Sequence, residues 1–341
     1  MEQQRVIVVT GANGGIGAAA ARELARQGHR LALVGLERAD TEGLAAELGA
    51  SAYVADFSSF AQVHELGRRL LADLPRVDVL VNNAGMMSGT RRAVTEDGNE
   101  WTFQVNHLAP FLLTQLLAPR LAEWGGRVVV TASLMSSSRL ARFDPENLAG
   151  GRHLASARRF RALDAYAASK LANIAFAAEV PARIGAVQAV SFHPGIVRTN
   201  FGAEGPLFVR TFMRSPFRAF LRSPERAADS LVWLATVDGA QLLDGAYYFD
   251  RRPIRPNPLV YDARFRRALW RRSHELVNAA AHGGPLAPAA PVVTAPTPVA
   301  PVDAARAVGS SNATAKAVSA ALAGVRQRSL EPADPLAAGA L

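Results

Sequence analysis

The sequence has 341 residues, of which 49% are hydrophobic and 20% are charged. It is therefore long enough to bury the core of one large domain or two small ones. It contains no cysteine, which excludes disulfides, thiolate metal sites and a cysteine nucleophile. The formal net charge of +9 would suit a nucleic-acid partner, but no zinc-finger, helix-turn-helix or RNA-binding motif accompanies the basic residues. We expect a solvated basic surface and no nucleic-acid partner.

The chain offers no sequence signal for a membrane or a metal. Its first apolar run, residues 5–10, is too short for a signal peptide or a membrane span, and no later stretch approaches the ~20 apolar residues of a spanning helix. No group of His and carboxylate residues has the spacing of a metal site. We expect a cytoplasmic protein with no integral membrane segment and no bound metal.

Short apolar runs alternate with longer amphipathic stretches up to about residue 250. This alternation is typical of a parallel sheet with helices on both faces. We predict an α/β fold with a doubly wound (Rossmann) sheet of about seven strands in a single domain. The predicted strands lie at 5–10, 31–35, 52–57, 77–85, 126–133, 186–195 and 245–250, and the predicted helices at 15–27, 41–48, 59–74, 100–123, around residues 164–176, and at 227–235.

The composition changes after residue 282. A last amphipathic helix is predicted over 261–277, and we expect it to pack on the domain formed by residues 1–282. From residue 283 the chain is rich in Ala and Pro and lacks aromatic residues, so it cannot bury enough apolar area to offset its ordering entropy. We predict a disordered tail over 283–341.

Two motifs indicate chemistry. Gly11, Gly15 and Gly17 follow the first predicted strand and open the first predicted helix, an arrangement that lets backbone amides approach a pyrophosphate at a helix N-terminus. Tyr166 and Lys170 stand four residues apart in an alanine-rich helix, so phenol and ammonium share one face. An ammonium beside a phenol favours the phenolate, which is useful for proton transfer near neutral pH.

Together these and other motifs resemble the short-chain dehydrogenase/reductase family. The match includes "NNAG" at 82–85, Asn106 in "FQVNHLAPFLLT", Ser133 in "VVVTAS" and the Pro194–Gly195 turn after the sixth strand. Six motifs stand in the family's order across roughly residues 5–250. The wording "NHLAPFLLT", "SKLANIAFA" and "HPGIVRTNFG" is most similar to the retinol-dehydrogenase-like branch.

The resemblance implies hydride transfer between a nicotinamide cofactor and a carbonyl/alcohol pair. It assigns general acid/base chemistry to Tyr166, substrate-oxygen binding to Ser133, and a water-mediated proton relay to Asn106. Lys170 would lower the tyrosine pKa together with the oxidised nicotinamide, and would contact the nicotinamide ribose. The mechanism needs no imidazole, so His107 and His193 are not expected to be catalytic. The implied cofactor-binding residues are Thr10, Gly11, Asn13, Gly15, Ile16, Gly17, Arg38, Asp56, Phe57, Asn83, Ala84, Gly85, Tyr166, Lys170, Pro194, Gly195, Val197 and Thr199.

Cofactor preference depends on the end of the second strand, "LVGLERAD". An acidic residue there favours NAD, whereas an arginine accommodates the 2′-phosphate of NADP. Gly35 occupies the acidic position, and Arg38 lies just beyond, although Glu37 argues for NAD. We expect a preference for NADP(H) over NAD(H).

The segment 196–223 contains Phe201, Phe208, Phe212, Phe217 and Phe220. We expect it to form an apolar lid over a bulky carbonyl or alcohol substrate, and the alternative is a hairpin that packs on another subunit. Other readings are a catalytically silent nucleotide sensor and a C=C reductase of the protochlorophyllide-reductase type. We expect the Tyr166 helix to expose small and apolar residues on faces suited to helix packing, and therefore expect a homo-oligomer; these residues are Ala168, Leu171, Ala175 and Ala178.

Overall fold

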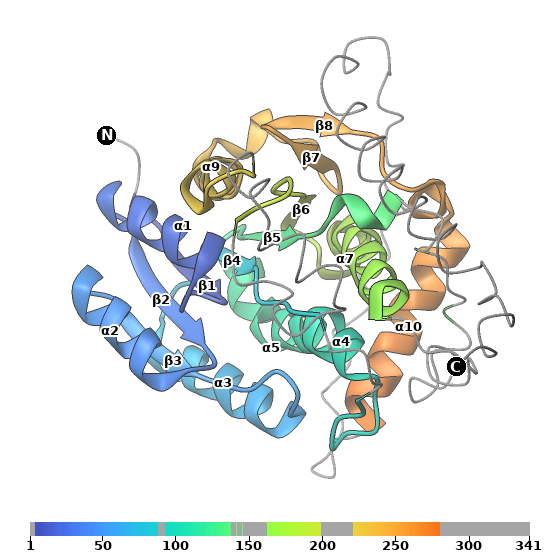
Figure 1. Cartoon of the computed structure of the whole chain (residues 1–341), viewed down its shortest axis with the longest axis horizontal. Coiled ribbons are helices and arrows are strands. Elements are labelled where there is room, and N and C mark those ends of the chain that lie inside the picture. The colour runs from blue at the N-terminus through green and yellow to red at the C-terminus, as the bar shows by residue number, and fades with distance from the viewer. Residues whose placement is uncertain are drawn as a thin grey trace, which may run out of the picture. The chain divides into compact units, whose positions relative to one another are not determined.

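The computed structural model describes residues 4–87, 93–137, 141, 145, 162–198 and 221–279. They form an eight-stranded sheet in the order β3-β2-β1-β4-β5-β6-β7-β8 (Figure 1). The strands are β1 (Val6–Thr10), β2 (Arg30–Gly35), β3 (Ser51–Val54), β4 (Val79–Asn82), β5 (Arg127–Thr131), β6 (Gln188–Phe192), β7 (Tyr247–Phe249) and β8 (Arg252–Ile254). The first seven run parallel, and the order reverses between β1 and β4, where a doubly wound sheet binds its ligands.

Helices cover both faces of the sheet, as predicted. One apolar core lies under α1 (Gly15–Arg26), α2 (Arg38–Leu48) and α9 (Pro224–Thr236). The other lies under α3 (Phe60–Asp73), α5 (Ala109–Glu123) and α7 (Ala162–Ile184), with α10 (Ala263–Ala279) packed against α5 and α7. The near-continuous apolar strands of the sequence are therefore buried from both sides.

An unpredicted eighth strand follows the seventh through a two-residue turn. Asp250 and Arg251 have φ angles of 47° and 62°, and Phe249 pairs with Arg252 across the turn. Two consecutive positive φ angles are those of a type I′ hairpin, which usually carries Asn-Gly or Asp-Gly. Because Asp-Arg is not a typical sequence for this turn, β8 has no local signal in the sequence.

The helix predicted over 100–123 is interrupted. It starts as α4 (Trp101–Phe103), passes through the π-helical turn η1 (Gln104–Leu108) and continues as α5. A π turn contains an extra residue and is frequent at functional sites. Asn106 lies in this turn, and its amide hydrogen-bonds the backbone of Met86 in both directions. The interruption thus fixes Asn106 against the loop after β4.

The expectation that the Tyr166 helix exposes a packing face is wrong. Ala168 and Leu171 are fully buried, and Ala175 and Ala178 are at most 9% exposed. They belong to the core shared with α10 and the sheet of the same chain. The basis for a homo-oligomer contact through this helix is therefore removed.

Two other expectations lie largely outside the described residues. These are the 283–341 tail and most of the 196–223 segment, of which the structure describes 196–198 and 221–223. Those two ends are joined by backbone hydrogen bonds. The Arg198 amide donates to the Arg222 carbonyl, and the Arg222 amide donates to the Ile196 carbonyl. The segment between them thus begins and ends at one place, beside the Pro194–Gly195 turn.

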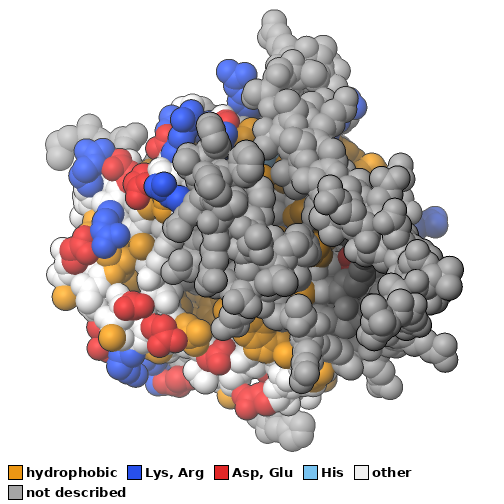
Figure 2. All heavy atoms as spheres, viewed as in Figure 1, with side chains coloured by type: hydrophobic (Ala, Val, Ile, Leu, Met, Phe, Trp, Pro, Cys, Tyr) orange, Lys and Arg blue, Asp and Glu red, His pale blue; other side chains and the backbone are white. Residues whose placement is uncertain are grey.

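Charges of both signs are mixed on the surface over α1, α2 and α3 (Figure 2). The exposed arginines there pair with nearby carboxylates, as in Arg22–Glu47 and Arg68–Glu65. The positive charge of these arginines is therefore locally balanced over α1, α2 and α3.

Candidate functional site

The glycine-rich loop between β1 and α1 has the shape that a phosphate site requires. Gly11 has a φ of +67°, and a Cβ on it would lie 2.9 Å from the Cα of Ala84. A Cβ on Gly17 would lie only 2.1 Å from the carbonyl oxygen of Gly11. The helix α1 begins after Gly14 without a side-chain cap and without an acidic residue in its first turn. Its first amides therefore suit an anion such as a pyrophosphate.

Thr10 and Asn83 tie this loop to the strand beside it. The Thr10 hydroxyl donates to the Val81 carbonyl at 3.1 Å and accepts from the amides of Asn83 and Ala84, both at 3.0 Å. The Asn83 side chain donates to the Thr10 carbonyl and accepts from the Thr131 hydroxyl. Asn83 therefore holds β1, β4 and β5 in register at their carboxyl ends.

The predicted catalytic side chains come together at the carboxyl end of β5. Ser133 lies two residues beyond this strand, and its hydroxyl is hydrogen-bonded to Tyr166 of α7. The Lys170 ammonium lies 5.7 Å from the centre of the Tyr166 ring and donates to the Thr131 carbonyl at 3.0 Å. A Cβ on Gly85 would lie 3.1 Å from both Lys170 Nζ and Asn106 Oδ1. The lysine thus lies directly against the backbone of the "NNAG" motif.

Burial opposes ionisation of both groups of the pair. It raises the pKa of Tyr166 to about 12, although the Ser133 hydrogen bond acts in the opposite direction. It also lowers the pKa of Lys170 to about 8. In the protein alone the phenol is therefore a proton donor, and the lysine gives up its proton more readily than a solvated lysine does.

Asn106 is fully buried and its side chain is fully engaged. Its Nδ2 donates to the Met86 carbonyl at 2.9 Å and to the Ser169 hydroxyl at 3.1 Å, while its Oδ1 accepts from the Met86 amide. These contacts place Asn106 beside the Tyr166–Lys170 turn of α7. The water relay implied by the resemblance stays a prediction.

The predicted adenosine-side residues lie at the ends of β2 and β3. Arg38 starts α2 and forms an exposed pair with Glu42 at 2.7 Å. Asp56 closes a turn by accepting from the Ser58 amide at 2.8 Å, and Phe57 beside it is buried. A Cβ on Gly35 would lie 2.1 Å from the Thr41 hydroxyl, so the end of β2 has no room for a side chain while Thr41 keeps this position.

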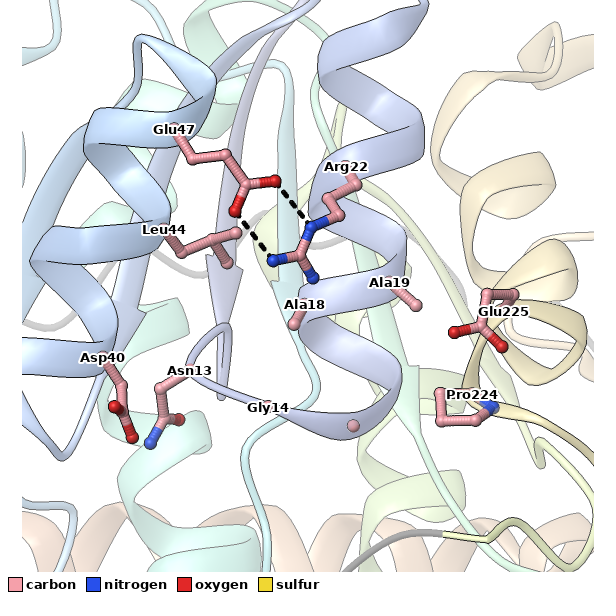
Figure 3. Close-up of a pocket in the computed structure, with 11 residues that line it drawn as sticks. Asn13, Gly14, Ala18, Ala19, Arg22, Asp40, Leu44, Glu47, Pro224 and Glu225 are labelled. Carbon is pink, nitrogen blue, oxygen red and sulfur yellow. Dashed lines mark hydrogen bonds and ion pairs between the residues drawn. The ribbon is translucent and has the colours of Figure 1, made fainter.

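A cavity of about 460 Å³ lies beside the glycine loop, bordered by α1, α2 and the start of α9 (Figure 3). Asn13, Gly14 and Gly15 line its edge, and Ile16 follows them in the first turn of α1. The Arg22–Glu47 pair bridges the cavity from α1 to α2. The glycine loop therefore forms one edge of this cavity.

The turn after β6, at Pro194 and Gly195, is held in place by Arg222. Gly195 has a φ of +85°, and a Cβ there would lie 2.9 Å from the Arg222 side chain. Pro194 precedes it, and Val197 pairs with Arg222 in an isolated β-bridge. Thr199 lies outside the described residues.

The two histidines near these motifs are buried and neutral. His193 stacks on Phe249 with ring centres 4.2 Å apart, and burial lowers its pKa to about 4. His107 is completely buried, and desolvation lowers its pKa to about 4 as well. Neither ring is available as a proton shuttle near neutral pH.

Sequence reasoning missed two buried residues near the site. Burial raises the pKa of Tyr247 of β7 strongly, and the nearby Tyr166 phenol raises it further. Asn173 of α7 donates to the same Thr131 carbonyl as Lys170. The only sequence signal for Asn173 was its place three residues after Lys170, one helical turn along the same face.

Comparisons with known proteins agree with this arrangement. The sequence profile of the family described as short chain dehydrogenase matches residues 5–144. A protein named "Putative daunorubicin C-13 ketoreductase" from Streptomyces sp. (strain C5) is 44% identical over 280 residues, which cover 80% of this chain and 93% of that protein. Human "Retinol dehydrogenase 13" is 32% identical over 80% of this chain and 85% of its own.

A solved structure shares the fold. The alcohol dehydrogenase from the archaeon Thermococcus sibiricus, complexed with 5-hydroxy-NADP, superposes with a TM-score of 0.52 at 26% identity, covering 69% of this chain and 92% of that chain. Within the described residues, no helix is both long and apolar enough to cross a bilayer.

Proposed function

Because the chain belongs to the short-chain dehydrogenase/reductase family, we propose that it is an NADP(H)-dependent oxidoreductase that interconverts a carbonyl group and an alcohol on a bulky apolar substrate. The single observation that carries this proposal is the hydrogen bond between the half-buried Ser133 and the buried Tyr166, beside the buried Lys170. A sensor that had lost its chemistry would have no need to keep these three groups together.

The residues of the chain divide the work of proton transfer. Ser133 binds the substrate oxygen and holds it next to the Tyr166 hydroxyl. Tyr166 donates its proton to that oxygen during reduction and accepts a proton from the alcohol during oxidation. Lys170 supplies positive charge beside the phenol, which stabilises the phenolate that remains after donation. The nicotinamide, when bound, supplies or accepts the hydride.

The residues present fit a nicotinamide dinucleotide. The close backbone approach at Gly11 and Gly17 and the uncapped start of α1 suit its pyrophosphate. The gap at Gly85 keeps backbone rather than side chain against Lys170. Lys170 then remains accessible to the ribose hydroxyls that the family resemblance assigns to it.

Three features of the β2–α2 junction support NADP(H) over NAD(H). Gly35 offers no carboxylate and has no room for one beside Thr41. Arg38 stands at the start of α2, and its exposed pair with Glu42 stabilises little and is easily exchanged. The N-terminus of α2 carries no side-chain cap from Glu37. A 2′-phosphate at this position would meet the Arg38 guanidinium at the start of α2, which would have to outweigh Asp40 in the same first turn.

A bulky ketone is the substrate class that the chain supports best. The Streptomyces relative is named as a ketoreductase acting at C-13 of daunorubicin. The segment 196–223, whose ends are joined beside the Pro194–Gly195 turn, contains five phenylalanines. We infer that it contributes an apolar wall to the substrate site.

The test is turnover by matched proteins. NADPH and NADH are titrated by protein fluorescence against the wild type and Tyr166→Phe, and oxidation is followed with a panel of aromatic and aliphatic ketones. We expect both proteins to bind NADPH and only the wild type to oxidise it. Binding without turnover on any ketone would favour the silent sensor, and absence of nucleotide binding would refute the proposal.

A further inference from the structure

A chain of buried polar groups leads from α10 to the catalytic lysine. Ser273 Oγ of α10 lies 2.9 Å from His107 Nε2 in the π turn, and His107 Nδ1 lies 3.3 Å from Asn173 Oδ1 of α7. Asn173 Nδ2 donates to the Thr131 carbonyl at 3.4 Å, and Lys170 Nζ donates to the same oxygen at 3.0 Å. Each of the side chains from Ser273 to Lys170 is at most 3% exposed.

The hydrogen bonds of this chain run in one direction. Because Asn173 Nδ2 donates to Thr131, its Oδ1 is the acceptor that faces His107. His107 must then carry its proton on Nδ1, which leaves Nε2 to accept from the Ser273 hydroxyl. The ring is neutral, since burial lowers its pKa to about 4. The Thr131 carbonyl, which can only accept, therefore fixes the orientation of the Asn173 amide, and that amide fixes the His107 tautomer, to which the Ser273 hydroxyl donates.

The helix α10 has other anchors, so Ser273 is not needed to hold it. Arg266 forms a buried ion pair with Glu179 of α7 at 3.0 Å and donates to the Val260 carbonyl. The Trp270 ring packs edge-on against Phe111 with centres 5.0 Å apart. Removal of the Ser273 hydroxyl therefore alters the polar chain while α10 stays in place.

The two donors at Thr131 compete for one acceptor. An amide donor that shares a carbonyl with an ammonium lowers the negative potential available to the ammonium. The Lys170 ammonium is thus bound less tightly in its resting position than it would be alone. This matters because Lys170 has to supply its charge to Tyr166 and to the cofactor.

We propose that Asn173 is a positioning residue whose amide, held from α10 by the hydrogen bonds of His107 and Ser273, shares the Thr131 carbonyl with Lys170 and leaves the ammonium available to Tyr166 and the cofactor. The role in catalysis rests on the proposed function. The coupling between Asn173 and Lys170 does not, and it can be measured without any turnover.

The protein is well suited to a direct measurement of the pKa of Lys170, because Lys170 and Lys316 are its two lysines. Lysine labelled with ¹³C at Cε gives two side-chain signals in the full-length protein, and Lys170→Arg identifies the signal of Lys170. Titration of this signal gives the pKa of Lys170 in the wild type and in Ser273→Ala, Asn173→Leu and Asn173→Asp.

Each substitution that breaks the hydrogen-bonded series from Ser273 to Lys170 should raise the pKa of Lys170. Asn173→Leu removes the competing donor, and Ser273→Ala takes away the partner of His107 Nε2, which loosens the ring and the Asn173 amide that it holds against Thr131. Asn173→Asp places a negative charge there and should give the largest rise, above one pH unit. We expect rises of at least several tenths of a unit for the other two variants, which correspond to roughly twofold or larger changes in the ionisation equilibrium.

Two controls separate positioning from stability. Ser273→Thr keeps the hydroxyl and should retain the wild-type pKa of Lys170. Leu269→Ala, on the buried side of the same helix, should lower the melting temperature without changing the pKa of Lys170. In the ketone assay, Asn173→Leu should reduce kcat by about tenfold, the cost of a misplaced hydrogen bond. An unchanged Lys170 pKa in folded Ser273→Ala and Asn173→Leu would overturn the proposal. A shifted pKa in a protein without turnover would retain the coupling and refute the proposed function instead.

Discussion

At the scale of single residues, the site is defined by what burial does to ionisable groups. The sequence predicts that Lys170 lowers the pKa of Tyr166, but in the protein alone burial outweighs this effect and raises it to about 12. Desolvation cannot be derived from residue spacing, because it depends on every element that covers the pair. The identity of the two groups was predictable, whereas their electrostatic environment was not.

The buried histidines give a prediction for the pH dependence of stability. His107 and His193 have folded pKa values of about 4, below the unfolded value of about 6.5. The unfolded chain therefore binds more protons between these values, and the free energy of unfolding should fall as pH decreases from 6.5 toward 4. The slope should approach roughly 1.4 kcal/mol per pH unit for each histidine.

Urea unfolding at a series of pH values measures this slope. His193→Asn should reduce it by the share of one histidine, and His274→Asn, at a partly exposed position on α10, serves as the control that should not. A free energy of unfolding that stays constant from pH 6.5 to pH 4.5 would show that these imidazoles are not buried as neutral groups.

Arg38 gives a prediction for cofactor preference. If its guanidinium binds the 2′-phosphate, Arg38→Ala should raise the KM for NADPH by about tenfold and leave the KM for NADH within twofold, since only NADPH carries that phosphate. Steady-state kinetics with both cofactors measure the two values. Arg26→Ala, in an exposed pair with Glu23 at the far end of α1, is the matched control. Equal effects of Arg38→Ala on the two cofactors would contradict the assignment.

At the scale of secondary structure, regular elements were predictable and their irregularities were not. The alternation of apolar runs predicted the parallel strands and the helices between them, because hydrophobic periodicity reports burial directly. The π turn at 104–108 depends on a tertiary contact between Asn106 and Met86. The β7–β8 hairpin depends on positive φ angles at residues with side chains. Neither has a local sequence signal.

That hairpin can be tested through its strained turn. Arg251 has a φ of 62°, a conformation that costs an ordinary residue about 1 kcal/mol relative to glycine. Arg251→Gly should therefore raise the free energy of unfolding by roughly 0.5–1 kcal/mol, because its exposed pair with Asp229 at 3.7 Å contributes little.

Thermal and urea unfolding measure the change. Arg252→Gly is the matched control, since Arg252 lies in β8, where glycine weakens the strand. It should lower the stability while Arg251→Gly raises it. A loss of stability in both variants would mean that the turn does not have the left-handed conformation described.

At the scale of the whole described domain, α10 joins the end of the chain to the catalytic helix. Its amphipathic pattern predicted a helix that packs on the domain, and it does so against α5 and α7. The pattern did not show that this packing covers the small residues of α7. It also gave no sign that Ser273 lies 2.9 Å from His107, 166 positions earlier in the chain. Contacts this distant follow from topology rather than from any motif.

The central claim is that this domain transfers a hydride to a carbonyl carbon with Tyr166 as the proton donor. The most direct measurement uses NADPH deuterated at nicotinamide C4, with each of its two epimers in turn, and an aromatic ketone that also carries a C=C bond. Mass spectrometry and NMR then locate the deuterium in the product. We predict that one epimer places deuterium on the carbinol carbon with the wild type, and that Tyr166→Phe yields little or no labelled alcohol. Deuterium on an alkene carbon, or equal transfer by Tyr166→Phe, would contradict the account.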